Sequence, residues 1–126
     1  MREETKVIVT EAGNAAVAGG KTTLPAREAV TQVVSGWQGV SMHAHRFGGV
    51  EFRLGRRELG HLHATFADLP FPVATRNDLI AAGRAMPHHI LPESGWVTAP
   101  MRSSADVETV IELFRQNYER AMKSHG

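Results

Sequence analysis

Six of the seven histidines of this chain lie between residues 43 and 89, and four of them form two His-x-His pairs. Side chains of a β-strand alternate between its faces and rise ~3.3 Å per residue, so each pair places two imidazoles on one face about 6.6 Å apart. An imidazole binds transition metals or exchanges a proton near neutral pH. The spacing predicts a functional site on a sheet and leaves both chemistries open. The histidines concerned are His43, His45, His61, His63, His88 and His89.

One interpretation is a metal site. His43 and His45 with the carboxylate of Glu51, completed by His61 or His63, would give the ligand types seen in double-stranded barrel metalloproteins. The face on which Glu51 lies depends on the strand register, however, and the chain has too few predicted strands for such a barrel. We therefore expect no metal ion and no organic cofactor, and keep a histidine-based metal-binding protein as an alternative.

A second interpretation is metal-free chemistry by the histidines. His61, His63, His88 and His89, placed near Trp37, Trp96 and the segment with Phe66 and Phe71, would form a pocket that is half apolar and half basic. Such a pocket suits a flat aromatic ligand with an ionisable hydroxyl group. The competing structural explanation is that the imidazoles only hydrogen-bond to carbonyls and carboxylates. No Gly-x-Ser-x-Gly elbow and no phosphate-binding glycine loop is present.

The elements that must position these side chains alternate between helix and strand patterns. Gly48-Gly49 and Gly55-Arg56 mark two short turns, and strands joined by such turns are antiparallel. In the third strand we expect Arg57, Leu59, His61 and His63 on one face, with Gly60 marking a bulge or a close approach. The expected strands cover residues 40–47, 50–54, 57–63 and 96–101. The expected helices begin near residues 23, 75 and 104, with Thr75 as the cap of the second helix and Ser103 or Ser104 as the cap of the third.

The predicted fold is α+β, with an antiparallel sheet of about four to five strands, helices packed on one face and a long C-terminal helix. Residues 64–72, which contain two prolines, are expected to be a connection. Residues 1–22 form an N-terminal segment of uncertain order, in which 7–9 predict a short strand and 12–18 the start of a helix. Residues 23–126 are expected to be a single domain.

Composition limits the function classes. Fourteen Lys and Arg against thirteen Asp and Glu give a formal charge of +1, which argues against a general polyanion binder, so we expect no nucleic acid partner. The chain has no cysteine, which excludes disulfides and thiolate chemistry and fits a reducing compartment. We expect a cytoplasmic protein without a membrane segment, and homodimerisation stays open.

Three runs together resemble a known family: RRELGHLH, GRAMPHHILPESGWV and a closing helix that ends in NYERAM. They are similar to the bacterial branch of the luciferase-domain family, which is named for fungal luciferase. The fungal enzymes have a similar Arg-Glu-aliphatic-small-His-Met-His run, a later Gly followed at five positions by His, and a Trp-led strand before the final helix. Here these features are residues 57–63, Gly83 with His88, and Trp96. The C-terminal part also resembles the YjbR-type domains.

The fungal resemblance implies a cofactor-independent oxygenase that acts on a hydroxypyrone or another aromatic enol with O2. It implies His61 or His63 as the base and His88 as the residue that orients the ligand. We expect His43, His45, Arg57, Glu58, His89 and Trp96 to line the ligand site. The YjbR resemblance implies the competing class, a non-enzymatic binding module.

Overall fold

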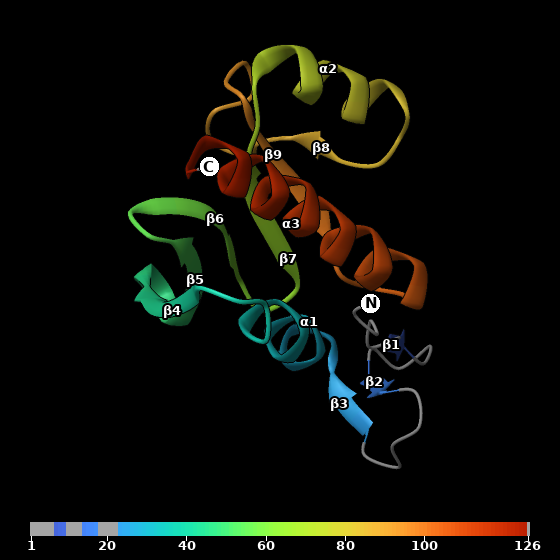
Figure 1. Cartoon of the computed structure of the whole chain (residues 1–126). Helices are drawn as coiled ribbons and strands as arrows, with labels where there is room; N and C mark the ends of the chain where they lie inside the picture. Colours follow the sequence, from blue (N-terminus) through green and yellow to red (C-terminus); the bar gives the residue numbers. More distant parts are fainter. Residues whose placement is uncertain (1–6, 10–13, 18–22, 126) are drawn as a thin grey trace.

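The computed structural model describes residues 7–9, 14–17 and 23–125 (Figure 1). It is an α+β fold with a six-stranded antiparallel sheet in the order β4-β5-β6-β7-β9-β8 and a smaller sheet in the order β1-β2-β3. The strands are β1 Val7–Val9, β2 Asn14–Val17, β3 Thr23–Pro25, β4 Val40–His45, β5 Gly49–Leu54, β6 Arg57–Leu62, β7 Phe66–Pro70, β8 Met86–Pro87 and β9 Trp96–Pro100. The helices are α1 Ala26–Ser35, α2 Val73–Ala81, α3 Ser104–His125 and a 3-10 turn at Arg46–Gly48.

The predicted fold class is confirmed, with more strands than the four to five expected. Two strands of the large sheet were missed, the two-residue β8 and β7. Strand β7 occupies the segment expected to be a connection and pairs with both β6 and β9. Its sequence, FADLP, contains an aspartate and ends on a proline, and both residue types are depleted in strands.

At the N-terminal end, the strand expected at residues 7–9 is confirmed as β1. The helix expected to start within 12–18 is wrong for residues 14–17, which form β2 because that segment pairs with β1 on one side and β3 on the other. The other residues of the expected 1–22 segment lie outside the described residues.

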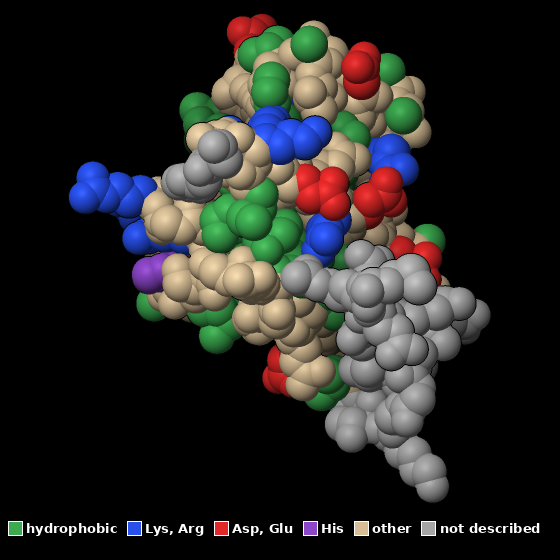
Figure 2. All heavy atoms as spheres, in the orientation of Figure 1, with side chains coloured by type: hydrophobic (Ala, Val, Ile, Leu, Met, Phe, Trp, Pro, Cys, Tyr) green, Lys and Arg blue, Asp and Glu red, His purple; other side chains and the backbone are tan. Residues whose placement is uncertain are grey.

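Helices α1 and α3 cover one face of the large sheet, and α2 lies beside the β8 edge (Figure 1). Phe52 of β5 packs edge-to-face against Phe114 of α3, with ring centroids 5.5 Å apart. Hardly any histidine side chain shows on the face viewed in Figure 2, where α3 crosses the sheet. The helical face therefore supplies the apolar core and leaves the histidines to the other face.

The long helix begins with side-chain caps on its first backbone N–H groups. The N–H of Asp106 donates to Ser103 Oγ at 3.1 Å, and the Asp106 carboxylate accepts the N–H of Arg102 at 2.9 Å. This decides between the two expected caps in favour of Ser103. The expected cap Thr75 is wrong, because α2 begins earlier, at Val73 directly after Pro72.

A β-bulge in β6 decides which side chains reach the open face. The register shifts between Phe52 and Arg53, so that Leu59 is an extra residue in β6, and Glu51 then lies opposite His61. The expectation that Arg57 and Leu59 share a face with His61 is wrong for this reason. Leu59 is fully buried in the core, and Arg57 lies opposite Leu54 on the helical side.

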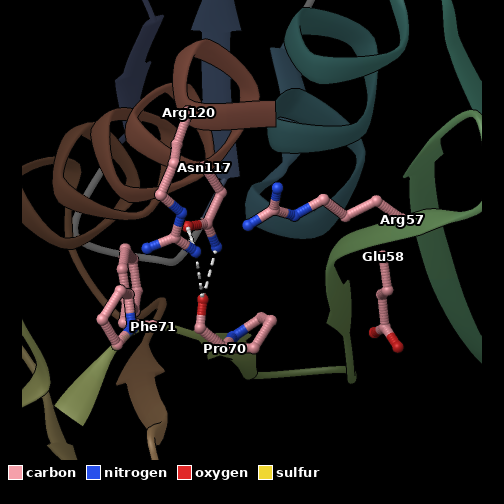
Figure 3. A pocket seen from close by; sticks show the side chains of 7 residues that line it. Arg57, Glu58, Pro70, Phe71, Asn117 and Arg120 are labelled. Carbon is pink, nitrogen blue, oxygen red and sulfur yellow. Dashed lines mark hydrogen bonds between the residues drawn. The ribbon is translucent and has the colours of Figure 1, made fainter. Parts of the chain in front are cut away.

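Gly60 allows this bulge, and Asn117 of α3 holds it. Gly60 has a φ of 152°, and a Cβ there would lie 2.8 Å from Phe114 Cε1 and 2.9 Å from the carbonyl oxygen of Asp68. The buried Asn117 Nδ2 donates to the carbonyl oxygen of Leu59 at 2.9 Å. It also donates to the carbonyl oxygen of Pro70 at 2.9 Å (Figure 3). The expected bulge and close approach at Gly60 are both confirmed.

We predict that Gly60→Ala lowers the free energy of unfolding by about 2–4 kcal/mol, because the added methyl group combines overpacking with a φ that other residues rarely adopt. The matched control is Gly83→Ala. Gly83 also has a positive φ, +73°, but a Cβ there meets no atom within 4 Å, so only about 1 kcal/mol is expected. Urea unfolding of both variants measures the difference, and equal losses would contradict a packing role for Gly60.

Candidate functional site

Four imidazoles converge on one carboxylate oxygen on the open face of the sheet. Oδ2 of Asp68 lies 3.0 Å from His63 Nε2, 3.2 Å from His89 Nε2, 3.3 Å from His61 Nε2 and 3.5 Å from His88 Nε2. Asp68 itself is 1% exposed. We call Asp68 and these four histidines the Asp68 cluster. It confirms that His61 and His63 come together with His88, although they lie in separate parts of the chain.

Strand pairing places the centre of the cluster. Asp68 of β7 lies between His61 of β6 and Thr98 of β9, and Thr98 Oγ1 donates to Asp68 Oδ1 at 2.7 Å. His63 follows β6, and its N–H donates to the carbonyl of Phe66 at 2.8 Å, which closes the turn into β7. The carboxylate thus has one oxygen held by a hydroxyl and one oxygen facing the imidazoles.

His88 and His89 reach the cluster from the other end of the sheet. They follow β8, the short strand that pairs with β9. The Nδ1 atom of His88 accepts the N–H groups of Ile90 and Leu91 at 3.1 and 3.0 Å. Because Nδ1 is an acceptor, the hydrogen of a neutral His88 ring lies on Nε2, which makes this nitrogen a donor toward Asp68.

The opposite arrangement holds at His61. Its Nδ1 lies 2.7 Å from Glu58 Oε2, and an ionised carboxylate only accepts, so Nδ1 carries a hydrogen. His45 repeats the pattern, with Nδ1 3.0 Å from Glu51 Oε1, and Arg53 donates to the other oxygen of Glu51. The His45 ring stacks on the His61 ring with centroids 3.9 Å apart. Carboxylates therefore fix the orientation of both rings.

Charge in the cluster is shared unevenly. Burial lowers the pKa of His61, but its hydrogen bonds to Asp68 and Glu58 outweigh burial and raise the pKa to about 9. Burial raises the pKa of Asp68, and hydrogen bonds from His61, Thr98 and His89 outweigh it and hold that pKa well below its usual value. Burial lowers the pKa of His63 and of His88, and Asp68 does not offset it. One carboxylate thus supports one imidazolium, and His63 and His88 are neutral at pH 7.

Aromatic rings border the cluster. Trp96 lies 5.4 Å from His61 and 6.0 Å from His88 between ring centroids, and Phe66 stacks on His63 at 4.4 Å. Trp37, which was expected near the pocket, instead packs on Tyr118 of α3 at 5.3 Å. The expected mixture of apolar and imidazole groups is therefore present, with Trp96 and Phe66 as its apolar part.

Two residues expected to contact a ligand lie away from the cluster. His43 is exposed and pairs with Ser41 at 2.8 Å. Arg57 reaches back to α3, where Nη1 donates to Ser124 Oγ at 2.9 Å. Arg57 and Glu58 line a cavity of about 380 Å³ beside Pro70, Phe71, Asn117 and Arg120, in which their side chains point in different directions (Figure 3). Glu58 connects this cavity to the cluster through His61.

Among the described residues, the groups that could hold a metal ion are His61, His63 and Asp68, and Asp68, His88 and His89. The set expected from the sequence, His43 and His45 with Glu51, does not assemble, because His43 bonds to Ser41 and Glu51 bonds to His45 through Nδ1. Asp68 and Thr98 were missed by sequence reasoning. An aspartate between apolar residues, five positions after His63, was the available signal.

One part of the chain is similar to a known protein family. Residues 56–117 match the family model of the luciferase domain. The match confirms the resemblance drawn from the sequence, and it contains the whole Asp68 cluster with Trp96 but not His43 or His45. No curated protein and no solved structure matches the chain. Within the described part of the chain, no helix has the length and apolar character needed to cross a membrane.

We predict that the His61 ring, in protein treated with a chelator, titrates near pH 9 by NMR. Asp68→Asn and Glu58→Gln should each move its pKa toward the usual 6.5, because each removes an acceptor that favours the imidazolium. Glu119→Gln is the control, since Glu119 is exposed and pairs with Arg115. A wild-type pKa near 6.5 would contradict this account of the cluster.

The same shift makes stability depend on pH. A histidine whose pKa rises on folding stabilises the folded state below its unfolded pKa, and this contribution is lost as the pH rises through the folded value. We therefore expect the free energy of unfolding to fall between about pH 6.5 and pH 9.5. The loss should be at most about 3 kcal/mol, since one pKa unit corresponds to ~1.4 kcal/mol. Urea unfolding at both pH values measures it, with Glu58→Gln showing a smaller difference.

Proposed function

We propose that this protein binds a small, flat aromatic ligand with an acidic enol hydroxyl at the Asp68 cluster and oxidises it with O2. The observation that carries this proposal is the convergence of four imidazole Nε2 atoms on the open face of the sheet, beside two aromatic rings. The family match is compatible with it, because the matched residues 56–117 include the cluster.

The ligand class follows from the groups around the cluster. Trp96 and Phe66 offer apolar ring surfaces next to His61 and His63, which favours a planar unsaturated ring system. The imidazole nitrogens offer donors and a proton acceptor at the same place, which favours a hydroxyl group that ionises. A hydroxypyrone combines both features, and it is the substrate class that the fungal resemblance implies.

The residues divide the first step between them. His88 orients the ligand oxygen, because its Nε2–H is a donor fixed by the two backbone N–H groups on Nδ1. Of the two bases that the fungal resemblance implies, His63 accepts the hydroxyl proton, because its ring is neutral and presents Nε2 beside Asp68, whereas His61 already carries a proton. The enolate that forms is held by the imidazole donors, with Asp68 as the buried counter-charge of the imidazolium.

Oxygen then enters as the second reactant. The enolate carbon supplies the electron pair that forms a C–O bond with O2, O2 is reduced to the peroxide level, and the enolate becomes a ketone. The imidazolium returns its proton to the terminal peroxide oxygen. One enol and one O2 thus give one keto-hydroperoxide, and loss of CO2 from this product is the later step that the fungal resemblance implies.

The test uses an aryl-substituted hydroxypyrone and the full chain. In a Trp37→Phe background, Trp96 is the single tryptophan, so its fluorescence reports binding at the cluster. We expect quenching and a raised melting temperature, with His63→Ala weakening binding at least tenfold and reducing O2 uptake in an oxygen electrode. His43→Ala is the control, since that exposed imidazole lies away from the cluster.

Two results would overturn the proposal. One is ligand binding that His63→Ala leaves unchanged. The other is stabilisation by oligonucleotides alone, weakening steeply with salt, which would favour the YjbR-like binding module instead. Binding without O2 uptake would retain the ligand site and reject the oxygenase.

A further inference from the structure

We infer that His61, His63 and Asp68 form a binding site for a divalent transition metal ion, Fe²⁺ or Zn²⁺. The inference deepens the proposed function, because it assigns a cofactor to the same site. It also replaces the expectation of a cofactor-free protein and the ligand set of His43, His45 and Glu51.

More imidazole nitrogens face Asp68 than its free oxygen can accept hydrogen bonds from. A carboxylate oxygen has two lone pairs, and Oδ1 already accepts Thr98. Four imidazole nitrogens nevertheless lie within 3.5 Å of Oδ2. Two lone pairs accept at most two N–H donors, so at least two of the four nitrogens need another partner. A cation that accepts lone pairs from imidazole supplies it.

The separations of the ligand atoms match those around one ion. Two atoms bound at ~2.1 Å to the same metal lie about 3.0 Å apart at an octahedral angle and about 3.4 Å apart at a tetrahedral angle. Asp68 Oδ2 lies 3.0 Å from His63 Nε2 and 3.3 Å from His61 Nε2. The three ligand atoms all lie within 4.8 Å of one another. An ion fits them with small side-chain rotations.

The hydrogen bonds of the rings select the ligands. His61 donates from Nδ1 to Glu58, so in its neutral form the Nε2 lone pair is free for a metal, and the carboxylate–histidine pair is the usual support of such a ligand. His88 has its hydrogen on Nε2, because Nδ1 accepts two backbone N–H groups. His88 is therefore a positioning residue that donates to Asp68, and His89, whose side chain is 43% exposed, lies at the solvent side of the site.

The donor set indicates the class of metal. Two imidazoles and one carboxylate suit Zn²⁺ and Fe²⁺ better than Ca²⁺ or Mg²⁺, which prefer oxygen ligands. Three protein ligands leave positions open for water or a ligand, and two histidines with one carboxylate are the ligands of non-haem Fe²⁺ oxygenases. A bound ion would stabilise the ionised hydroxyl of the ligand in place of proton transfer to His63.

The experiment measures metal content in the untagged full chain. Protein is treated with a chelator, incubated with Fe²⁺ without oxygen or with Zn²⁺, desalted and analysed by elemental mass spectrometry. We expect about one ion per chain in the wild type and in the control His43→Ala, and less than 0.2 ions in His63→Ala. Retention and the rise in melting temperature are compared for Fe²⁺ and Zn²⁺, and the ion with the larger values is the one that the site prefers.

Substitutions around the ligands separate direct from indirect effects. Glu58→Gln and His88→Asn should keep one ion per chain but weaken its binding about 10–100-fold, because they only position the ligands. Circular dichroism identifies any variant that fails to fold, and substitution with Co²⁺ gives a second measurement. Visible absorption of wild-type Co²⁺ protein should indicate nitrogen and oxygen ligands and should vanish in His63→Ala.

The inference is overturned if the folded wild type retains neither ion, or if His63→Ala retains as much as the wild type. These failures differ from a failure of the proposed function. Hydroxypyrone binding and O2 uptake by chelator-treated protein would reject the metal and keep the oxygenase, whereas one bound ion without either activity would do the reverse.

Discussion

The buried carboxylate of Asp68 is the constraint on which the open face of the sheet depends. An ionised group buried in the middle of a sheet costs several kcal/mol unless charge and hydrogen bonds compensate it. Here a hydroxyl from β9 takes one oxygen, and imidazoles from β6, from the turn before β7 and from the segment after β8 surround the other. The histidines that compensate the buried charge come from distant parts of the chain, and Asp68 holds them together. The same contacts therefore stabilise this region and assemble the candidate site.

The backbone must place these groups on the face opposite the helices, and the β-bulge in β6 makes this possible for His61. A regular β6 would place Leu59 and His61 on the same face, and one of them would then be misplaced. The extra residue at the bulge lets Leu59 enter the core while His61 faces Asp68. Only a glycine at position 60 permits this next to Phe114, and Asn117 binds the carbonyl of Leu59 from α3. The helical face thereby stabilises an arrangement whose purpose lies on the other side of the sheet.

Sequence reasoning predicted what depends on local pattern. Turn glycines, the capping residues of α3 and the His-x-His spacing are short-range features, and from them the α+β class and the proximity of His61 to His63 follow. It failed where tertiary contacts decide. Segment 66–70 resembles a connection until strands on both sides pair with it, so Asp68 was missed. The alternation rule wrongly placed Arg57 on the same face as His61. A bulge of one residue between them exchanges the two faces of the strand, and its only sign in the sequence is Gly60. His43 satisfied the spacing rule as well as His61 did, but it lies on the edge strand β4, where fewer groups surround it.

The side chains of the Asp68 cluster differ in their exposure to solvent, which indicates from which side a ligand would reach them. The side chain of Asp68 is 1% exposed, those of His88 and His61 are 9% and 10% exposed, and those of His63 and His89 are 21% and 43% exposed. A ligand arriving from solvent therefore meets His89 and His63 first, and it cannot reach Asp68 without displacing them. Asp68 is thus suited to be a counter-charge or a metal ligand, and poorly suited to react with an organic substrate directly. Trp96 borders the deeper rings and Phe66 the outer ones, so an aromatic ligand would lie along this gradient with its polar end inward. In both proposals the positive charge lies at the inner end of the site, where His61, His63 and Asp68 would share a proton or a metal ion.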